Sequence, residues 1–257
     1  MRLVLLALSL VATPALAGKP KLCTTQVEAV ASHMYSWPDS TKTAVFLVSI
    51  PMLDEYATKI EGGSNPNLNP EEMVAAATWM RTPVEVRWDL DHNKLIPSPT
   101  PPPPVAHEVS AAALQQIQGG MLQGLGGVPG MLAMVADGFP KGAIMCEKRG
   151  KQWVMTPTDG SAQTSGYFVV DRASMLVNDI VGPTPTGGEM TVHVTGWTAV
   201  DGDRFAPGGF TLPMPDGSEG GIALQWDAQQ GVWLPTAIDV SAGEVQMGFA
   251  FAFQRFE

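Results

Sequence analysis

The stretch Glu244 to Phe256, with the sequence EVQMGFAFAFQRF, decides the fold because its side chains alternate in size. In an extended strand, successive side chains point to opposite faces. Its large side chains share one face: Phe249, Phe251 and Phe253. Its small ones share the other: Gly248, Ala250 and Ala252. This pattern predicts a strand with one strongly apolar face.

The same period-two pattern extends upstream to Ala143, with turn signals between its segments. Asp159-Gly160, Asp201-Gly202 and Asp216-Gly217 are three of these turns. We expect nine strands in this antiparallel meander: Ala143 to Lys148, Gln152 to Thr156, Gly166 to Asp171, Met175 to Val181, Met190 to Val200, Arg204 to Leu212, Gly220 to Asp227, Trp233 to Val240 and Glu244 to Phe256.

The first half of the chain mixes helices and strands. Thr25 to Trp37 and Pro70 to Trp79 are predicted helices, the second with Asn69 as its cap. Thr43 to Ile50 and Val84 to Leu90 are predicted strands, whereas residues 52 to 61 are ambiguous. The fold class expected is therefore mainly β (α+β): a curved antiparallel sheet or half-barrel of about 9 to 11 strands covered by short helices.

Residues 1 to 17 read as a cleaved secretory signal peptide. Arg2 supplies the positive start, Leu3 to Ala12 is an apolar run, and Ala15-Leu16-Ala17 is a typical cleavage pattern. The run is too short to span a bilayer, which needs about 20 residues. We expect cleavage after Ala17, a periplasmic location with secretion or outer-membrane association as alternatives, and a single β-rich domain over residues 18 to 257.

The charge of the mature chain argues against nucleic acid as a partner. Without Arg2, 14 basic and 25 acidic residues remain, so the net charge is 14 − 25 = −11. Such a charge repels phosphate backbones and anionic membrane surfaces.

Cys23 and Cys146 are the two cysteines of the chain. Exported proteins usually meet oxidising conditions, which favours a disulfide between them. Such a bridge closes a loop of over 120 residues and is worth up to about 4 to 5 kcal/mol on a chain-entropy argument. Two free, buried thiols are the alternative.

Two unusual segments lie between the halves of the chain. Residues 97 to 104 hold six prolines in eight positions, which predicts a polyproline II connector without packing. Residues 109 to 136 carry no formal charge and show an apolar helical stripe interrupted by glycines and Pro129. We expect two short helices there, roughly 109 to 123 and 128 to 137, stabilised by packing. A membrane span is not expected, because glutamines and Pro129 interrupt the segment.

The sequence contains no complete catalytic or metal-binding motif. Asp89 to Asn93 begins like a calcium loop, but Lys94 and Thr100 stand where glycine and glutamate are needed, so a polar turn is the better interpretation. The four histidines are scattered: His33, His92, His107 and His193. Nucleophile-elbow, phosphate-loop and dinucleotide motifs are absent. We expect neither an enzyme nor a metal or cofactor site.

The order of elements in the second half resembles the LolA-like superfamily of periplasmic lipoprotein carriers and sorting proteins. The resemblance rests on Tyr167 to Asp171, on Val200-Asp201-Gly202-x-Arg204-x-x-Pro207 and on Gly231-Val232-Trp233-Leu234-Pro235-x-x-Ile238. It covers about residues 143 to 257, with weaker agreement from Thr25 to Leu90. It implies an incomplete curved sheet covered by helices, with an acyl chain bound between them. The segments 97 to 104 and 109 to 136 do not match the family pattern.

The function expected is a periplasmic, non-enzymatic protein that holds a lipid or lipoprotein acyl chain between the curved sheet and a helical lid over 109 to 137. The ligand-binding residues predicted on the lid and on the facing wall are Met121, Leu125, Met131, Met134, Phe249, Phe251 and Phe253. The alternative is that these residues fill a closed core. The protein would then be an envelope interaction or structural module, with another envelope protein as its partner.

Overall fold

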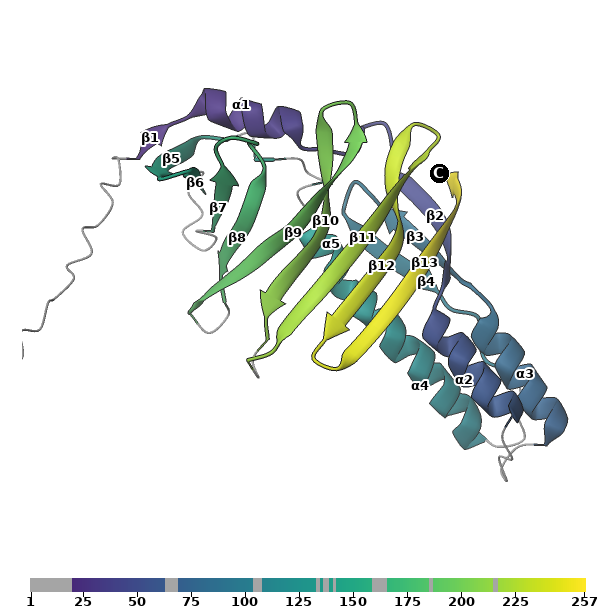
Figure 1. Cartoon of the computed structure of the whole chain (residues 1–257). Helices are drawn as coiled ribbons and strands as arrows, with labels where there is room; N and C mark the ends of the chain where they lie inside the picture. Colours follow the sequence, from purple (N-terminus) through teal and green to yellow (C-terminus); the bar gives the residue numbers. More distant parts are fainter. Residues whose placement is uncertain are drawn as a thin grey trace, which may run out of the picture.

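The described part of the computed structural model comprises residues 20–62, 69–103, 108–132, 135, 139–140, 142–158, 166–184, 187–214 and 217–257. The expected signal peptide, and the Asp159-Gly160 turn, lie outside it. Within it, thirteen antiparallel strands form one sheet that does not close (Figure 1). The predicted fold class is confirmed, with two strands beyond the eleven expected.

Nine consecutive strands form the meander that the sequence predicts. They are β5 (Ile144–Arg149), β6 (Gln152–Pro157), β7 (Tyr167–Asp171), β8 (Val177–Pro183), β9 (Glu189–Asp201), β10 (Arg204–Pro213), β11 (Glu219–Gln229), β12 (Val232–Ala242) and β13 (Val245–Phe256). Each pairs with the next along the chain. Gly202, in a predicted turn, has the positive φ of 57° that favours glycine.

The strands of the first half extend this meander at both of its ends. β2 (Thr43–Ser49) pairs with β13, followed by β3 (Val84–Asp89) and β4 (Lys94–Ser98). At the opposite end, β1 (Lys21–Leu22) pairs with β5. The start of the described chain therefore lies at one edge of the sheet, and the hairpin β3–β4 lies at the other.

The strand β4 corrects the expectation for residues 97 to 104. Pro97 is paired with Val86 and Ser98 with Glu85, so the first two of these residues belong to the sheet. A proline is tolerated there because β4 is an edge strand, which needs hydrogen bonds on one side only. The polar turn predicted after Val84 to Leu90 is the connection that leads into β4.

Five α-helices and one 3₁₀ turn accompany the sheet in the described residues. They are α1 (Thr24–His33), α2 (Pro51–Gly62), α3 (Pro70–Arg81), α4 (Glu108–Gly124), the 3₁₀ turn η1 (Leu125–Gly127) and α5 (Val128–Met131). In Figure 1, α1 lies along one end of the first strands of the meander, and α4 leads from α5, behind the sheet, toward the pair α2 and α3.

The helix boundaries follow local sequence signals. Asn69 caps α3: its side chain accepts a hydrogen bond from the Glu72 N–H at 2.8 Å, and the Glu72 carboxylate accepts one from the Asn69 N–H at 3.1 Å. The expected joint in residues 109 to 137 is η1, and α5 spans Val128–Met131. Val135 is again helical, whereas residues 133–134 and 136–138, where the second helix was expected to continue and end, lie outside the described residues. No helix among the described residues is long and apolar enough to cross a membrane.

A single hydrophobic core lies between the helices and one face of the sheet. Directly opposed residues on neighbouring strands share a face, and one such row crosses β10 to β13: Phe210, Ile222, Val240 and Met247. Val27 and Val30 of α1, and Met34 directly after it, enter the same core. Burial of this face provides the main driving force for folding.

Candidate functional site

The predicted wall residues lie in the core. Phe249 is 1% exposed and Phe251 4% exposed, whereas Phe253 is half-buried and packs against the core. Phe251 and Phe253 both contact Phe46 of β2, with ring centroids 5.5 Å and 6.0 Å away. The apolar face predicted for Glu244 to Phe256 is therefore the face that packs into the hydrophobic core.

The sequence analysis did not assign a role to the aromatic residues that complete this wall. Trp88 of β3 is fully buried, and its ring lies 5.4 Å from that of Trp37 and 6.4 Å from that of Phe251. The alternation of Val84, Val86 and Trp88 was the available signal. What it did not reveal was that β2 and β3 continue the sheet beyond β13.

The predicted lid contributes buried side chains to the same core. Leu125, at 3% exposure, is followed along the stripe by Val128, Leu132 and Val135, all almost fully buried. Met121 and Met131 lie in α4 and α5, but their side chains are outside the described part, as is all of Met134. The structure therefore brings Leu125, Phe249, Phe251 and Phe253 into one hydrophobic cluster.

Among the described residues, two hydrogen bonds attach this helical segment to the rest of the molecule. The Asn93 side-chain amide, from the β3–β4 connection, donates to the Pro129 carbonyl. The Trp37 backbone N–H donates to the Val135 carbonyl at 3.0 Å. The segment is thus held by polar contacts near its C-terminal end as well as by its apolar stripe.

An apolar groove of about 720 Å³ opens between α1 and the edge of the sheet. Val27 and Ile144, both members of the core, form part of it. Leu22 also lines it and is 67% exposed. The remaining lining residues are Thr24, Glu28, Ala31, Ser32, Gly142 and Ala143. The groove has the size of typical small-molecule sites, and two core residues contribute to its lining.

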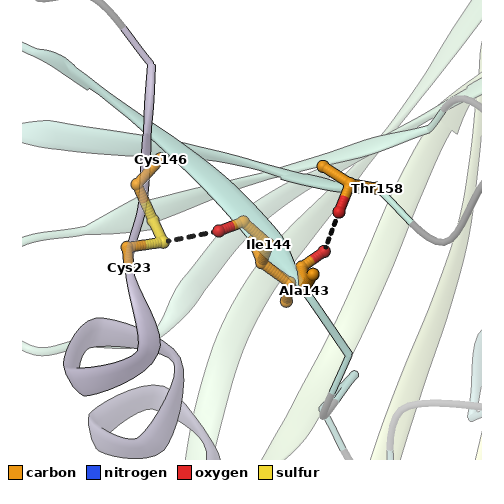
Figure 2. Close-up of a disulfide and its surroundings, with 5 residues drawn as sticks. All are labelled: Cys23, Ala143, Ile144, Cys146 and Thr158. Carbon is orange, nitrogen blue, oxygen red and sulfur yellow. Dashed lines mark hydrogen bonds between the residues drawn. A yellow bond between two sulfur atoms is a disulfide. The ribbon is translucent and has the colours of Figure 1, made fainter.

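A disulfide fixes one end of this groove. Cys23, directly before α1, is bonded to Cys146 of β5 with a Cα–Cα distance of 5.7 Å, so the predicted pairing is confirmed. Figure 2 shows the bridge beside Ile144. The Ile144 carbonyl accepts a hydrogen bond from the Cys23 backbone N–H at 3.2 Å. The hydroxyl of Thr158 donates to the Ala143 carbonyl at 2.7 Å. The groove wall is therefore covalently tied to the sheet.

The groove residues were not predicted from the sequence. Leu22 and Ala143 are far apart in the chain and meet because β1 pairs with β5. The only sequence signal for this proximity was the pair Cys23 and Cys146, which flank the groove. In the described residues, no group of three or more His, Cys, Asp or Glu side chains could hold a metal ion.

Comparisons with known proteins give no relative: no protein-family model, no curated protein and no solved structure matches this chain.

Proposed function

We propose that this protein is a non-enzymatic, periplasmic binding protein that holds a lipid or lipoprotein acyl chain between its unclosed sheet and its helical layer. The observation that carries the proposal is the apolar groove beside α1, whose lining includes the exposed Leu22 and the core residues Val27 and Ile144. The order of strands, with a meander whose apolar face is covered by helices, is also what the resemblance to LolA-like carriers implies.

The chemistry of the groove suits an acyl chain. Leu22, Val27 and Ile144 offer apolar contacts, and Thr24, Glu28 and Ser32 supply polar groups that a headgroup can meet. Each methylene transferred from water to such a surface contributes about 0.8 kcal/mol. Binding and release therefore require no covalent step, and α1 and the segment from α4 to α5 are the elements whose movement would extend the groove into the core.

Filling the groove tests the proposal. Ala143 lines it and is exposed, so Ala143→Trp should occupy the groove without disturbing the core. We expect this variant to bind the fluorescent fatty acid 11-(dansylamino)undecanoic acid at least about tenfold more weakly, a change of about 1.4 kcal/mol. Lys148→Trp, at an exposed position of the neighbouring strand β5, is the matched control and should bind as the original protein does.

Unchanged binding in Ala143→Trp would exclude the groove as the site. Absence of binding to the original protein would count against the function itself.

The second candidate is an envelope interaction module without a ligand cavity. It is favoured by the near-complete burial of Leu125, Phe249 and Phe251, which fill space that a ligand under the lid would need. The exposed, uncharged side of α4 would then be the docking surface: Ala112, Ala113, Gln115, Gln116 and Gln123. In this case Gln116→Glu with Gln123→Glu should abolish recovery of a cross-linked envelope partner, and the original protein should not bind the fatty acid.

A further inference from the structure

A second hollow, of about 610 Å³, lies on the side of the sheet that faces away from the core. It crosses β10 to β13. Its polar lining residues are Thr211 of β10, Asp239 and Ser241 of β12, Gln246 of β13 and, from the adjoining strand β9, Thr195.

The strand register explains why this hollow faces outward. The apolar row of Phe210, Ile222, Val240 and Met247 points into the core, so the residues on either side of it point away. They form two further cross-strand rows. The first row consists of Thr211, Gly221, Ser241 and Gln246, and the second includes Ala223, Asp239 and Gly248. The hollow is therefore a groove between two rows, and the backbone of the apolar row forms its floor.

Two glycines keep the groove open. A Cβ atom on Gly221 would lie 2.9 Å from the Ser241 hydroxyl oxygen, and one on Gly248 would lie 2.9 Å from a carboxylate oxygen of Asp239. Neither glycine has a positive φ, so the backbone conformation does not demand them. Glycine weakens a strand interior and is found where a ligand or another backbone approaches closely. Glycine at positions 221 and 248 therefore leaves room in the groove, although it makes the strands less stable.

The polar groups of the groove define the kind of ligand that fits. Threonine and serine hydroxyls both donate and accept hydrogen bonds, the Gln246 amide does both, and the Asp239 carboxylate accepts only. Asp239 forms no hydrogen bond or ion pair with any described residue, so its acceptor capacity is available. The lining includes no lysine or arginine among the described residues, so it does not match phosphate or sulfate groups.

We propose that this groove, on the outer face of β10 to β13, binds a neutral oligosaccharide. Such a chain presents many hydroxyls that donate to Asp239 and exchange hydrogen bonds with Thr211, Ser241 and Gln246. Four strands at about 4.8 Å spacing give the groove a length of about 14 Å, enough for more than one sugar unit. The inference is independent of the proposed acyl-chain site, because the two sites lie on different faces of the sheet.

The test is an NMR titration of the full-length protein with two probes, maltotetraose and tetra-N-acetylchitotetraose. We expect saturable shifts of the Thr211, Gly221, Ser241 and Gly248 amide signals with at least one of them. The double variant Gly221→Ala with Gly248→Ala narrows the groove and should weaken binding at least tenfold. It displaces only the ends of two flexible side chains, so it should fold.

The matched control is Gly182→Ala with Gly196→Ala, two strand glycines where a Cβ atom would meet nothing within 4 Å. This variant should bind as the original protein does. Asp239→Asn should also weaken binding, because it removes the carboxylate acceptor. Absence of saturable shifts with both probes, or equal binding by the groove variant and the control in folded samples, would overturn the proposal.

Discussion

At the scale of single residues, Tyr35 joins the segment after α1 to the sheet. Its side chain is buried, and its hydroxyl oxygen accepts a hydrogen bond from the Trp233 N–H at 2.8 Å. The Arg204 guanidinium lies 5.5 Å from the ring centroid. Burial raises the pKa of the Tyr35 hydroxyl above its usual value of 10.0, and the Trp233 hydrogen bond partly opposes this effect.

Tyr35→Phe should lower the free energy of unfolding by about 1 to 3 kcal/mol at neutral pH, because the Trp233 N–H loses its acceptor. A raised pKa in the folded state means that neutral Tyr35 stabilises the fold below pH 10.0 and that this contribution is lost as the pH rises through the folded pKa. Urea unfolding at about pH 8 and about pH 11 should therefore show a smaller alkaline loss in the variant. An equal loss in both proteins would contradict this role.

Arg81 connects α3 to α2 through two carboxylates. Its guanidinium donates to Asp54 at 2.7 Å and to Glu61 at 2.6 Å and 2.8 Å. The hydrogen bond from Arg81 lowers the pKa of Glu61 below 4.5. A lowered folded pKa contributes stability above pH 4.5 that is lost as the pH falls through the folded value.

In the Arg81→Gln variant, the melting temperature should fall less as the pH drops below 4.5. Without the arginine, Glu61 would have nearly the same pKa in the folded and unfolded states. The effect should be small, since all three groups are on the surface. Melting curves from about pH 7 to about pH 3 measure it. Arg87→Gln, at another exposed arginine, is the control, and identical acid dependence in the Arg81 and Arg87 variants would contradict the assignment.

At the scale of elements, local patterns predicted all nine meander strands, because each carries its own alternation and is bounded by turn residues. They also predicted the helix after Asn69 and the break in the segment after residue 108. β1 was not predicted, because its two residues are too few to show a pattern. β4 was not predicted, because Pro97 argues against a strand. α2 was left open because only Leu53 and Ala57 are buried in it, and because it packs against α3 and β13, which the local sequence does not describe.

Gly119 and Gly120 of α4 are destabilising residues that packing does not require. A Cβ atom on Gly120 would meet nothing within 4 Å, and its φ is not positive. Gly120→Ala should therefore raise the free energy of unfolding by up to about 1 kcal/mol. Gly202→Ala is the contrasting control, because its φ of 57° should make the same substitution destabilising. Chemical denaturation measures both, and destabilisation by Gly120→Ala would show that α4 needs this glycine.

The bridge between Cys23 and Cys146 holds α1 and β1 against β5. Replacing both cysteines by serine should lower the free energy of unfolding by about 2 to 5 kcal/mol, because the unfolded chain loses a large closed loop. Urea unfolding of the original protein with reductant should approach that of the variant. A variant as stable as the oxidised protein would show that the bridge contributes nothing to folding.

At the scale of the whole molecule, the sheet stays open because its two ends, β1 and β4, pair with other strands on one side only. The sequence predicted one apolar face and a helical cover for it. It could not predict the groove beside α1, because that site depends on the first described strand joining the far end of the meander. A site built from Leu22, Val27 and Ile144 exists only once the topology is known.

Native mass spectrometry of the protein, purified from its own host under mild conditions, tests the proposed function most directly. We expect a population of molecules carrying an added mass that fragments into an acyl-containing lipid or a lipoprotein, with less of it in Ala143→Trp than in Lys148→Trp. A spectrum that contains only the unliganded chain, together with no measurable binding of 11-(dansylamino)undecanoic acid, would contradict acyl-chain binding.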